Sequence, residues 1–184
     1  LPTKADAAAG KKLIASAGAE GKPVTMAYPS GDPQSEQLAT ITQQTGKAIG
    51  LDFRIKALPL QQYGSLFADP SARAKFDMII TKNYVERPEP ISMDQLYGRT
   101  GGATNFSEYS NSTVDDALAK ATATTEEEER AKLVLTAEHQ LDKDLPSIPI
   151  VGIRAIVYLN DDLAGAPLTF SYMSSAWAAR IGAK

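Results

Sequence analysis

The spacing of apolar side chains changes several times along residues 1–80, and each change marks an expected helix or strand. Residues 51–57 alternate apolar and polar side chains at every step, which is typical of a strand with one solvated face. Residues 34–49 carry apolar side chains three and four positions apart, which predicts an amphipathic helix. Short apolar runs at 24–28 and 76–80 predict two further strands.

Two more helices complete this order. The spacing predicts them over residues 4–17 and 61–67, with Thr3 as the N-cap of the first and Gly18 as the residue that ends it. Helices and strands then follow one another in strict alternation. That order favours an α/β sheet with helices packed on it.

Residues 82–112 differ from the segments before them, because prolines and glycines interrupt both the helical and the strand spacing of apolar side chains. Only a short helical signal remains, at 92–97. The stretch mixes aromatic rings with hydrogen-bonding side chains. That mixture fits the wall of a ligand site and fits a solvated surface loop equally well, so composition leaves both interpretations open.

Helical spacing returns over residues 113–121 and 126–144. We expect Thr125 to cap the second of these helices, and the four acids at 126–129 to favour its positively charged N-terminal end. The acidic run is therefore interpreted as a solvated helix start and not as a cation site. Two expected strands follow this helix, at 147–151 and 155–159.

The composition removes several classes of function. The 184 residues contain no cysteine, which excludes disulfides, thiolate metal sites and cysteine nucleophiles, and the one histidine leaves a histidine metal site without a second imidazole. The net charge of −3 gives no strong basic field, which argues against a nucleic-acid partner. No apolar run approaches the roughly 18 residues that a membrane-spanning helix needs. We expect no metal and no cofactor.

Catalytic motifs are equally scarce. The chain has no glycine-rich phosphate loop and no Gly-x-Ser-x-Gly turn. His139 lies inside the helix expected at 126–144, where a partly exposed helix histidine is the simpler interpretation. Carboxylates are plentiful, so a hydrolase that uses a pair of them stays open as an alternative, although no spacing singles out a pair.

Five segments, in order along the chain, resemble motifs of one protein family. Residues 11–18 are similar to its A-K-x-L-L-x-x-A-G helix, and residues 35–55 to a helix followed by its I-G-I-x-v-x-i strand. Residues 76–80 are similar to an F-D-L-x-I strand, residues 105–115 to N-x-x-x-Y-x-N-p-x-v-D, and residues 145–150 to L-P-x-I-P-L. Together they resemble the C-terminal third of the family 5 extracellular solute-binding proteins of ABC importers, which include peptide-, dipeptide- and oligopeptide-binding proteins.

This resemblance implies a fold and a division of the chain. The expected fold is α/β, one lobe of a type II periplasmic-binding-protein-like fold with a central mixed sheet flanked by helices. Residues 1–150 would form the lobe, with half of a ligand-binding cleft at loop 82–112. Residues 151–184 would form a returning strand and a tail directed toward a missing lobe. The chain is then expected to be a fragment of a longer two-lobe protein.

The resemblance also implies binding residues. In the family, the F-D-L-x-I strand is often followed by W-x-x-D-Y-x-D-P. In the peptide binders this stretch faces the cleft, and its first Asp can pair with the α-ammonium of the peptide. Here Glu86 stands in place of that Asp, Asn83 in place of the Trp and Arg87 in place of the aromatic residue. The expected ligand-binding residues are Asn83, Tyr84, Glu86 and Arg87, and the expected ligand is a peptide or another small solute.

The function implied by the resemblance is that of a substrate-binding component of an ABC transporter, with no catalytic residue. Its partners would be the ligand, the missing N-terminal lobe and a membrane permease. It would lie outside the cytoplasm, in the periplasm or on the cell surface, with a lipid anchor left open. Two alternatives remain: a carboxylate-based α/β hydrolase and a stand-alone α/β interaction domain. Turnover that is lost with one Asp or Glu would favour the hydrolase, whereas stoichiometric binding without product favours the transporter component.

Overall fold

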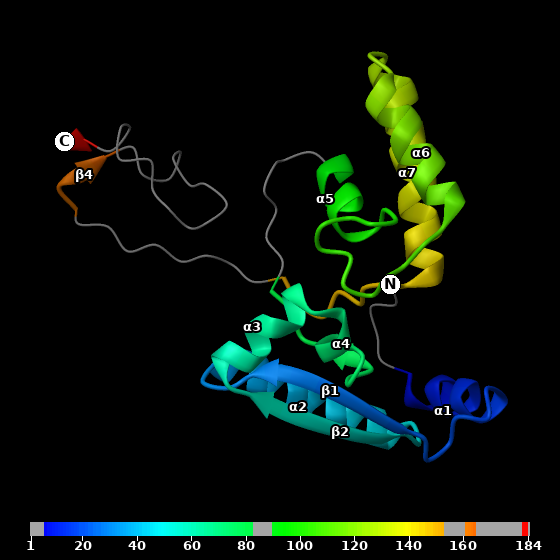
Figure 1. Ribbon diagram of the computed structural model, residues 1–184, viewed down its shortest axis with the longest axis vertical. Helices are drawn as coiled ribbons and strands as arrows, with labels where there is room; N and C mark the ends of the chain where they lie inside the picture. The colour runs from blue at the N-terminus through cyan, green and yellow to red at the C-terminus, as the bar shows by residue number, and fades with distance from the viewer. Residues whose placement is uncertain (1–5, 83–89, 153–160, 165–181, 184) are drawn as a thin grey trace. The chain divides into compact units, whose positions relative to one another are not determined.

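The computed structural model describes residues 6–82, 90–152, 161–164 and 182–183, and it divides into two compact units, Leu1–Lys82 and Asn83–Lys184 (Figure 1). Each unit is described by itself. The expected binding residues at positions 83–87, the strand expected at 155–159 and the N-cap expected at Thr3 lie outside the described residues. The division of the chain at residue 150 stays a prediction.

The first unit is a parallel sheet with helices between its strands, which confirms the expected α/β class. Strand β1 lies between β2 and β3, and both pairs are parallel. A parallel pair cannot be joined by a tight hairpin, and here each connection runs through one or more helices. In chain order the elements are α1 (Ala7–Ser16), β1 (Pro23–Pro29), α2 (Pro33–Ala48), β2 (Asp52–Leu58), α3 (Leu60–Ala68), α4 (Pro70–Arg73) and β3 (Met78–Ile79).

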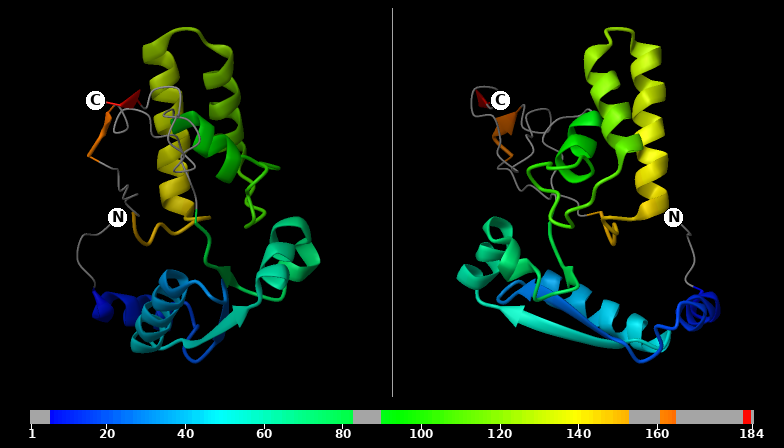
Figure 2. Two further views of the ribbon diagram at one scale, coloured as in Figure 1. Left: turned by 90° about the vertical axis from the view of Figure 1, so that its left-hand side faces the viewer. Right: turned by 45° about the vertical axis from the view of Figure 1, so that its right-hand side comes forward.

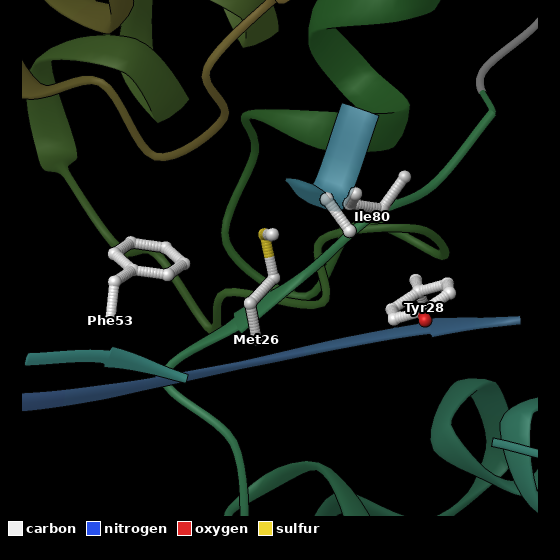
Figure 3. Close-up of a cluster of buried hydrophobic side chains, with 5 residues drawn as sticks. Met26, Tyr28, Phe53 and Ile80 are labelled. Atoms are coloured by element: carbon white, nitrogen blue, oxygen red, sulfur yellow. The ribbon is translucent and has the colours of Figure 1, made fainter. Parts of the chain in front are cut away.

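Helix α2 covers one face of this sheet. Alternate residues of β1, Met26 and Tyr28, point to that face and pack with Phe53 of β2, with Ile80 just after β3 and with Ala39 of α2 (Figure 3). All five are less than a tenth exposed. The alternation that predicted the strand at 51–57 therefore has the expected cause, a buried face under a helix.

Helix α3 packs on the opposite face. Ala27, which lies between the two core residues of β1, contacts a second buried cluster with Leu58, Tyr63 and Leu66. Phe67 meets Tyr63 edge to face, with 5.1 Å between the ring centroids, but remains 38% exposed. The sheet is thus covered on both faces, as parallel sheets generally are.

Asp77 joins the start of β3 to β1. Its backbone N–H donates to the Thr25 carbonyl at 2.9 Å, and its carboxylate accepts from the Thr25 N–H at 2.7 Å. The side chain thus supplies a bond that a strand of only two residues would lack. The aspartate of the F-D-M-I-I run is explained by this structural bond.

The second unit is built on a pair of long helices, α6 (Ser112–Ala123) and α7 (Glu127–Asp144), which lie side by side in both views of Figure 2. Their core consists of Val114, Ala117, Leu118 and Ala137. Helix α5 (Pro90–Tyr97) adds Ile91 to this core. Two short strands, β4 (Leu163–Ala164) and β5 (Gly182–Ala183), form an antiparallel pair.

The helix starts differ from two expectations. The expected cap at Thr3 is wrong, because Asp6 is the N-cap of α1 and accepts a hydrogen bond from the Ala9 N–H at 2.9 Å. The cap expected at Thr125 is wrong, because Glu126 occupies the N-cap position of α7 and its side chain makes no capping bond. The hydroxyl of Thr124 instead accepts from the Glu126 N–H at 3.2 Å. Gly18 follows α1 at φ +60°, as its expected role requires.

The strand expected at 147–151 is also wrong, since residues 147–152 form no strand. Ile148, Ile150 and Val151 are at least half exposed. Pro146 and Pro149 lack backbone N–H donors, and no strand within the described residues pairs with this segment. An apolar run alone was therefore not enough to predict a strand.

Two glycines offer a matched test of the α2 packing. A Cβ at Gly46 would overlap Cδ2 of the buried Phe53 ring, whereas one at Gly64 of α3 would meet nothing within 4 Å. We expect Gly46→Ala to destabilise the first unit by about 1–3 kcal/mol through overpacking. Gly64→Ala should stabilise it by up to about 1 kcal/mol through helix propensity. Native-state hydrogen exchange of the α2, β2 and α3 amides measures both, and equal effects of the two changes would contradict the packing.

Asp94 of α5 gives a prediction for the second unit. Its Oδ2 is buried without a hydrogen-bond partner among the described residues, and burial, followed by the charge of Glu138, raises the pKa of Asp94 to about 6. When folding raises the pKa of a carboxyl, the folded state loses stability as the carboxyl ionises. This loss begins near pH 4, the usual pKa of an aspartate, and continues through about pH 6.

We therefore expect Asp94→Asn to stabilise the second unit at pH 7, on the order of 1 kcal/mol after allowance for its partial exposure, with little effect at pH 4. Hydrogen exchange of variant and parent, compared at each pH, measures the difference. Asp116→Asn on the exposed face of α6 serves as the control. A gain for Asp94→Asn that is the same at both pH values would show that ionisation of this carboxyl is not the cause.

Candidate functional site

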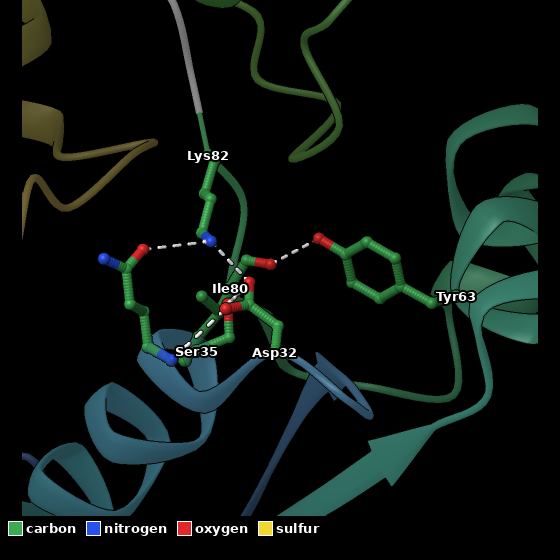
Figure 4. Close-up of polar contacts among 6 residues, drawn as sticks. Asp32, Ser35, Tyr63, Ile80 and Lys82 are labelled. Atoms are coloured by element: carbon green, nitrogen blue, oxygen red, sulfur yellow. Dashed lines mark hydrogen bonds and ion pairs between the residues drawn. The ribbon is translucent and has the colours of Figure 1, made fainter. Parts of the chain in front are cut away.

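The candidate site lies at the edge of the sheet where the parallel strands end. In open α/β sheets, ligands bind beyond the carboxyl ends of the strands. At this edge the chain leaves β1 and enters α2 through Asp32, and it leaves β3 through Ile80 and Lys82 (Figure 4). Segments nearly fifty positions apart in sequence therefore meet there.

Asp32 has two separate roles, one for each carboxylate oxygen. Oδ1 caps α2 by accepting from the Gln34 N–H at 3.2 Å. Oδ2 accepts from the Ser35 hydroxyl at 2.9 Å and forms an ion pair with Lys82 Nζ at 2.5 Å. The hydrogen bond from Lys82 is the main reason that the pKa of Asp32 is lowered, so the carboxylate is ionised at neutral pH.

Lys82 is held on two sides. Besides the ion pair, its ammonium donates to Gln34 Oε1 at 3.2 Å (Figure 4). The side chains of Lys82 and Asp32 are 30% and 25% exposed, so the pair is neither buried nor free in solvent. A lysine ammonium has three donors, and the described contacts use two of them.

Tyr63 of α3 fixes the chain two residues before Lys82. Its hydroxyl donates to the Ile80 carbonyl at 2.6 Å, and the Ile80 N–H donates to the Ala27 carbonyl at 2.9 Å. Burial, with a smaller contribution from the charge of Asp32, raises the pKa of Tyr63 to about 12. The phenol is therefore a neutral and permanent hydrogen-bond donor.

These groups are suited to holding the chain and binding polar groups, and they do not form a catalytic pair. Ser35 donates to Asp32, which resembles a nucleophile beside a base, but Ser35 is only 1% exposed and the lowered pKa of Asp32 makes that carboxylate a poor base. The described part of this edge gives the hydrolase alternative no support.

The expected binding residues follow directly on this edge. Asn83, Tyr84, Glu86 and Arg87 begin one residue after Lys82, outside the described residues, and their role as ligand contacts stays a prediction. Sequence reasoning did not identify Asp32. Its signal was the Asp-Pro pair at the start of an expected helix, which is typical of an N-cap followed by a proline in the first turn.

The loop before α6, in the second unit, has structural contacts instead of open hydrogen-bonding groups. Asn105 is 9% exposed; its amide donates to the carbonyls of Arg99 and Tyr109 at 3.0 and 2.8 Å. Its Oδ1 accepts from the Ser107 hydroxyl and the Tyr109 N–H at 3.0 and 3.1 Å. Asn105 therefore shapes the loop and leaves no hydrogen bond for a ligand.

The loop is also fastened to the end of α7. Asp144 Oδ2 accepts from the Tyr109 hydroxyl at 2.6 Å, from Asn111 at 2.9 Å and from Gln140 at 2.8 Å. Asn111 also caps α6 through the Thr113 N–H at 2.9 Å. For Asn105, Tyr109 and Asn111, a loop held by internal bonds explains the pattern without a ligand.

Two classes of feature are absent from the described part of the chain. None of its helices combines the length and the apolar character needed to cross a membrane. Within the same residues, no group of three or more histidine, aspartate or glutamate side chains is placed to hold a metal ion.

Comparison with known proteins gives a family match. The model of the bacterial extracellular solute-binding proteins, family 5 Middle, matches residues 1–105. That range includes the sheet, the Asp32–Lys82 edge and positions 83–87. A search of curated proteins found no match.

Solved structures share the fold. The murein tripeptide-binding protein MppA of Escherichia coli is 20% identical over 96% of this chain and 34% of its own, with a TM-score of 0.75. A putative peptide-binding protein, AppA of Clostridium difficile, is 22% identical over 95% and 36%, with a TM-score of 0.69. NikA of Staphylococcus aureus, solved with Ni(L-His)2, is 21% identical over 79% and 31%, with a TM-score of 0.68.

The chain thus spans about a third of the length of these proteins. The likenesses confirm the periplasmic-binding-protein-like fold expected from sequence. The family model covers more than half of the 184 residues. The chain therefore belongs to the family 5 bacterial extracellular solute-binding proteins.

Proposed function

We propose that this chain is part of the substrate-binding component of an ABC importer, which captures a peptide or a similar small solute between two lobes. The family match over residues 1–105 carries this proposal. The position of 83–87, directly after the carboxyl edge of the parallel sheet, supports it, because that edge is where open α/β sheets bind ligands.

Glu86 is proposed to receive the α-ammonium of the ligand. A carboxylate that accepts hydrogen bonds from an ammonium away from bulk water forms a charge-assisted bond, stronger than a neutral one. Arg87 would take a carboxylate of the ligand or balance Glu86, Tyr84 would offer an aromatic face, and Asn83 would offer amide hydrogen bonds. A peptide has an ammonium at one end and a carboxylate at the other, and Glu86 and Arg87 could pair with these two groups.

A nickel–amino acid complex is a second candidate ligand, favoured by the likeness to NikA, which was solved with Ni(L-His)2. Because the described residues hold no cluster of metal-ligating side chains, the metal would arrive with its own ligands. Such a complex would be recognised through the carboxylates and amines of its amino acids.

The remaining parts of the proposal concern the whole protein. Its family places it outside the cytoplasm, and we propose the periplasm or the cell surface, with a lipid anchor as the second possibility for attachment. A membrane permease would receive the loaded protein. Residues 1–150 would form one lobe, and 151–184 would lead toward the other.

The first test changes Glu86. In the complete protein, we expect Glu86→Gln to weaken binding of free-amine tripeptides by about tenfold to a hundredfold, because a hydrogen bond to a charged group contributes about 1.5–3 kcal/mol. Isothermal titration calorimetry with a pool of mixed-sequence tripeptides measures the affinity.

Glu20→Gln, the same chemical change at an exposed turn between α1 and β1, is the control and should bind normally. Unchanged affinity in Glu86→Gln would remove Glu86 from the site. Saturable binding of Ni(L-His)2 without any tripeptide binding would replace the peptide with the nickel complex. Product formation from the tripeptides would support the hydrolase alternative.

A further inference from the structure

The chain is fixed at two successive points as it leaves β3. Ile80 is the first, held by the Ala27 carbonyl on its N–H and by the Tyr63 hydroxyl on its carbonyl. Lys82 is the second, held by Asp32 and Gln34 at the start of α2 (Figure 4). Ile80 is held through its backbone and Lys82 through the end of its side chain, so the second contact limits the directions that the chain can take after β3.

We propose that Asp32 and Lys82 are positioning residues for ligand binding: their ion pair sets the direction in which the chain enters positions 83–87, and neither side chain needs to touch the ligand. This inference rests on the proposed function. Lys82 stands where the chain leaves the described edge, and Glu86 follows four residues later, within about 14 Å of extended chain.

The partial burial of the pair favours a stronger interaction than an ion pair on the open surface has. Its side chains are only 30% and 25% exposed, so solvent and salt screen it less than a pair on the open surface. Asp32 is itself held by the helix that it caps, and Ser35, 1% exposed, donates to the same oxygen that Lys82 contacts. The partner of Lys82 is therefore itself held by hydrogen bonds at the start of α2.

Accurate placement matters because a charge-assisted bond depends strongly on geometry. In enzymes, a misplacement of about 1 Å can cost about a hundredfold in rate, and an ammonium–carboxylate hydrogen bond also depends on geometry. If the direction of the chain at Lys82 were lost, the contact between Glu86 and the α-ammonium would weaken most. Contacts with the ligand that do not depend on charge would weaken less.

The test uses the complete protein and separates the ion pair from the helix cap. Asp32→Asn keeps an acceptor for the Gln34 N–H, because asparagine is as good an N-cap as aspartate, but removes the charge that Lys82 pairs with. Lys82→Met removes the cation, and Lys82→Arg restores it. Asp69→Asn is the matched control, because Asp69 is the N-cap of α4 and accepts from the Ser71 N–H at 2.8 Å.

The readout is the affinity for mixed-sequence tripeptides with free amino termini, divided by the affinity for the same pool after N-acetylation. A general loss of folded protein would lower both affinities together and leave this ratio unchanged. We expect Asp32→Asn and Lys82→Met each to reduce the ratio about tenfold, the double variant to be no worse than either, and Lys82→Arg to recover most of the preference. Asp69→Asn should keep the parent ratio.

The outcomes distinguish the positioning role, the ion pair and the proposed function from one another. If Glu86→Gln loses the free-amine preference while Asp32→Asn and Lys82→Met keep it, the positioning role is overturned and the proposed function stands. If the two single losses add in the double variant, the residues act independently and the ion pair is not the cause. If the parent protein binds neither pool, the peptide function fails and the positioning role fails with it.

Discussion

The central strand β1 is the constraint on which the first unit depends. Its seven residues pair with β2 along their whole length and with β3 at Met26 and Ala27, and successive side chains enter the two cores on opposite faces. Parallel pairing forces the chain to cross over through helices, which brings the starts of α2 and α3 to the carboxyl edge. The meeting of Asp32, Tyr63 and Lys82 at that edge is therefore a consequence of the sheet topology.

Much of this fold could be predicted from the sequence, because its causes are local. The alternation at 51–57 reflects a strand under a helix, and the spacing at 34–49 reflects a helix on a sheet. Local patterns failed where the deciding factor lay elsewhere in the chain or in one hydrogen bond. The apolar run at 147–151 has no strand to pair with among the described residues. At the start of α7, the hydroxyl of Thr124, one residue before the expected cap, accepts the hydrogen bond from the Glu126 N–H.

The candidate site shows the same division. Resemblance to a family directed attention to 83–87, since a motif is local. It could not reveal the Asp32–Lys82 pair, because nothing in the sequence joins two residues that only a parallel sheet brings together. For loop 82–112, composition left a ligand wall and a surface loop equally open. The bonds of Asn105 and Tyr109 account for the later part of that loop as structure, while positions 83–87 remain the proposed contact region.

The most direct test of the central claim, that the carboxyl edge of this sheet and the residues after it form the ligand site, is a hydrogen-exchange footprint. The complete protein would be compared with and without a saturating pool of free-amine tripeptides. Ligand-dependent protection should appear in the fragments that cover Ile80 to Pro90 and the first turn of α2. Saturable binding with protection confined to other regions, for example to the α6–α7 pair, would contradict the claim.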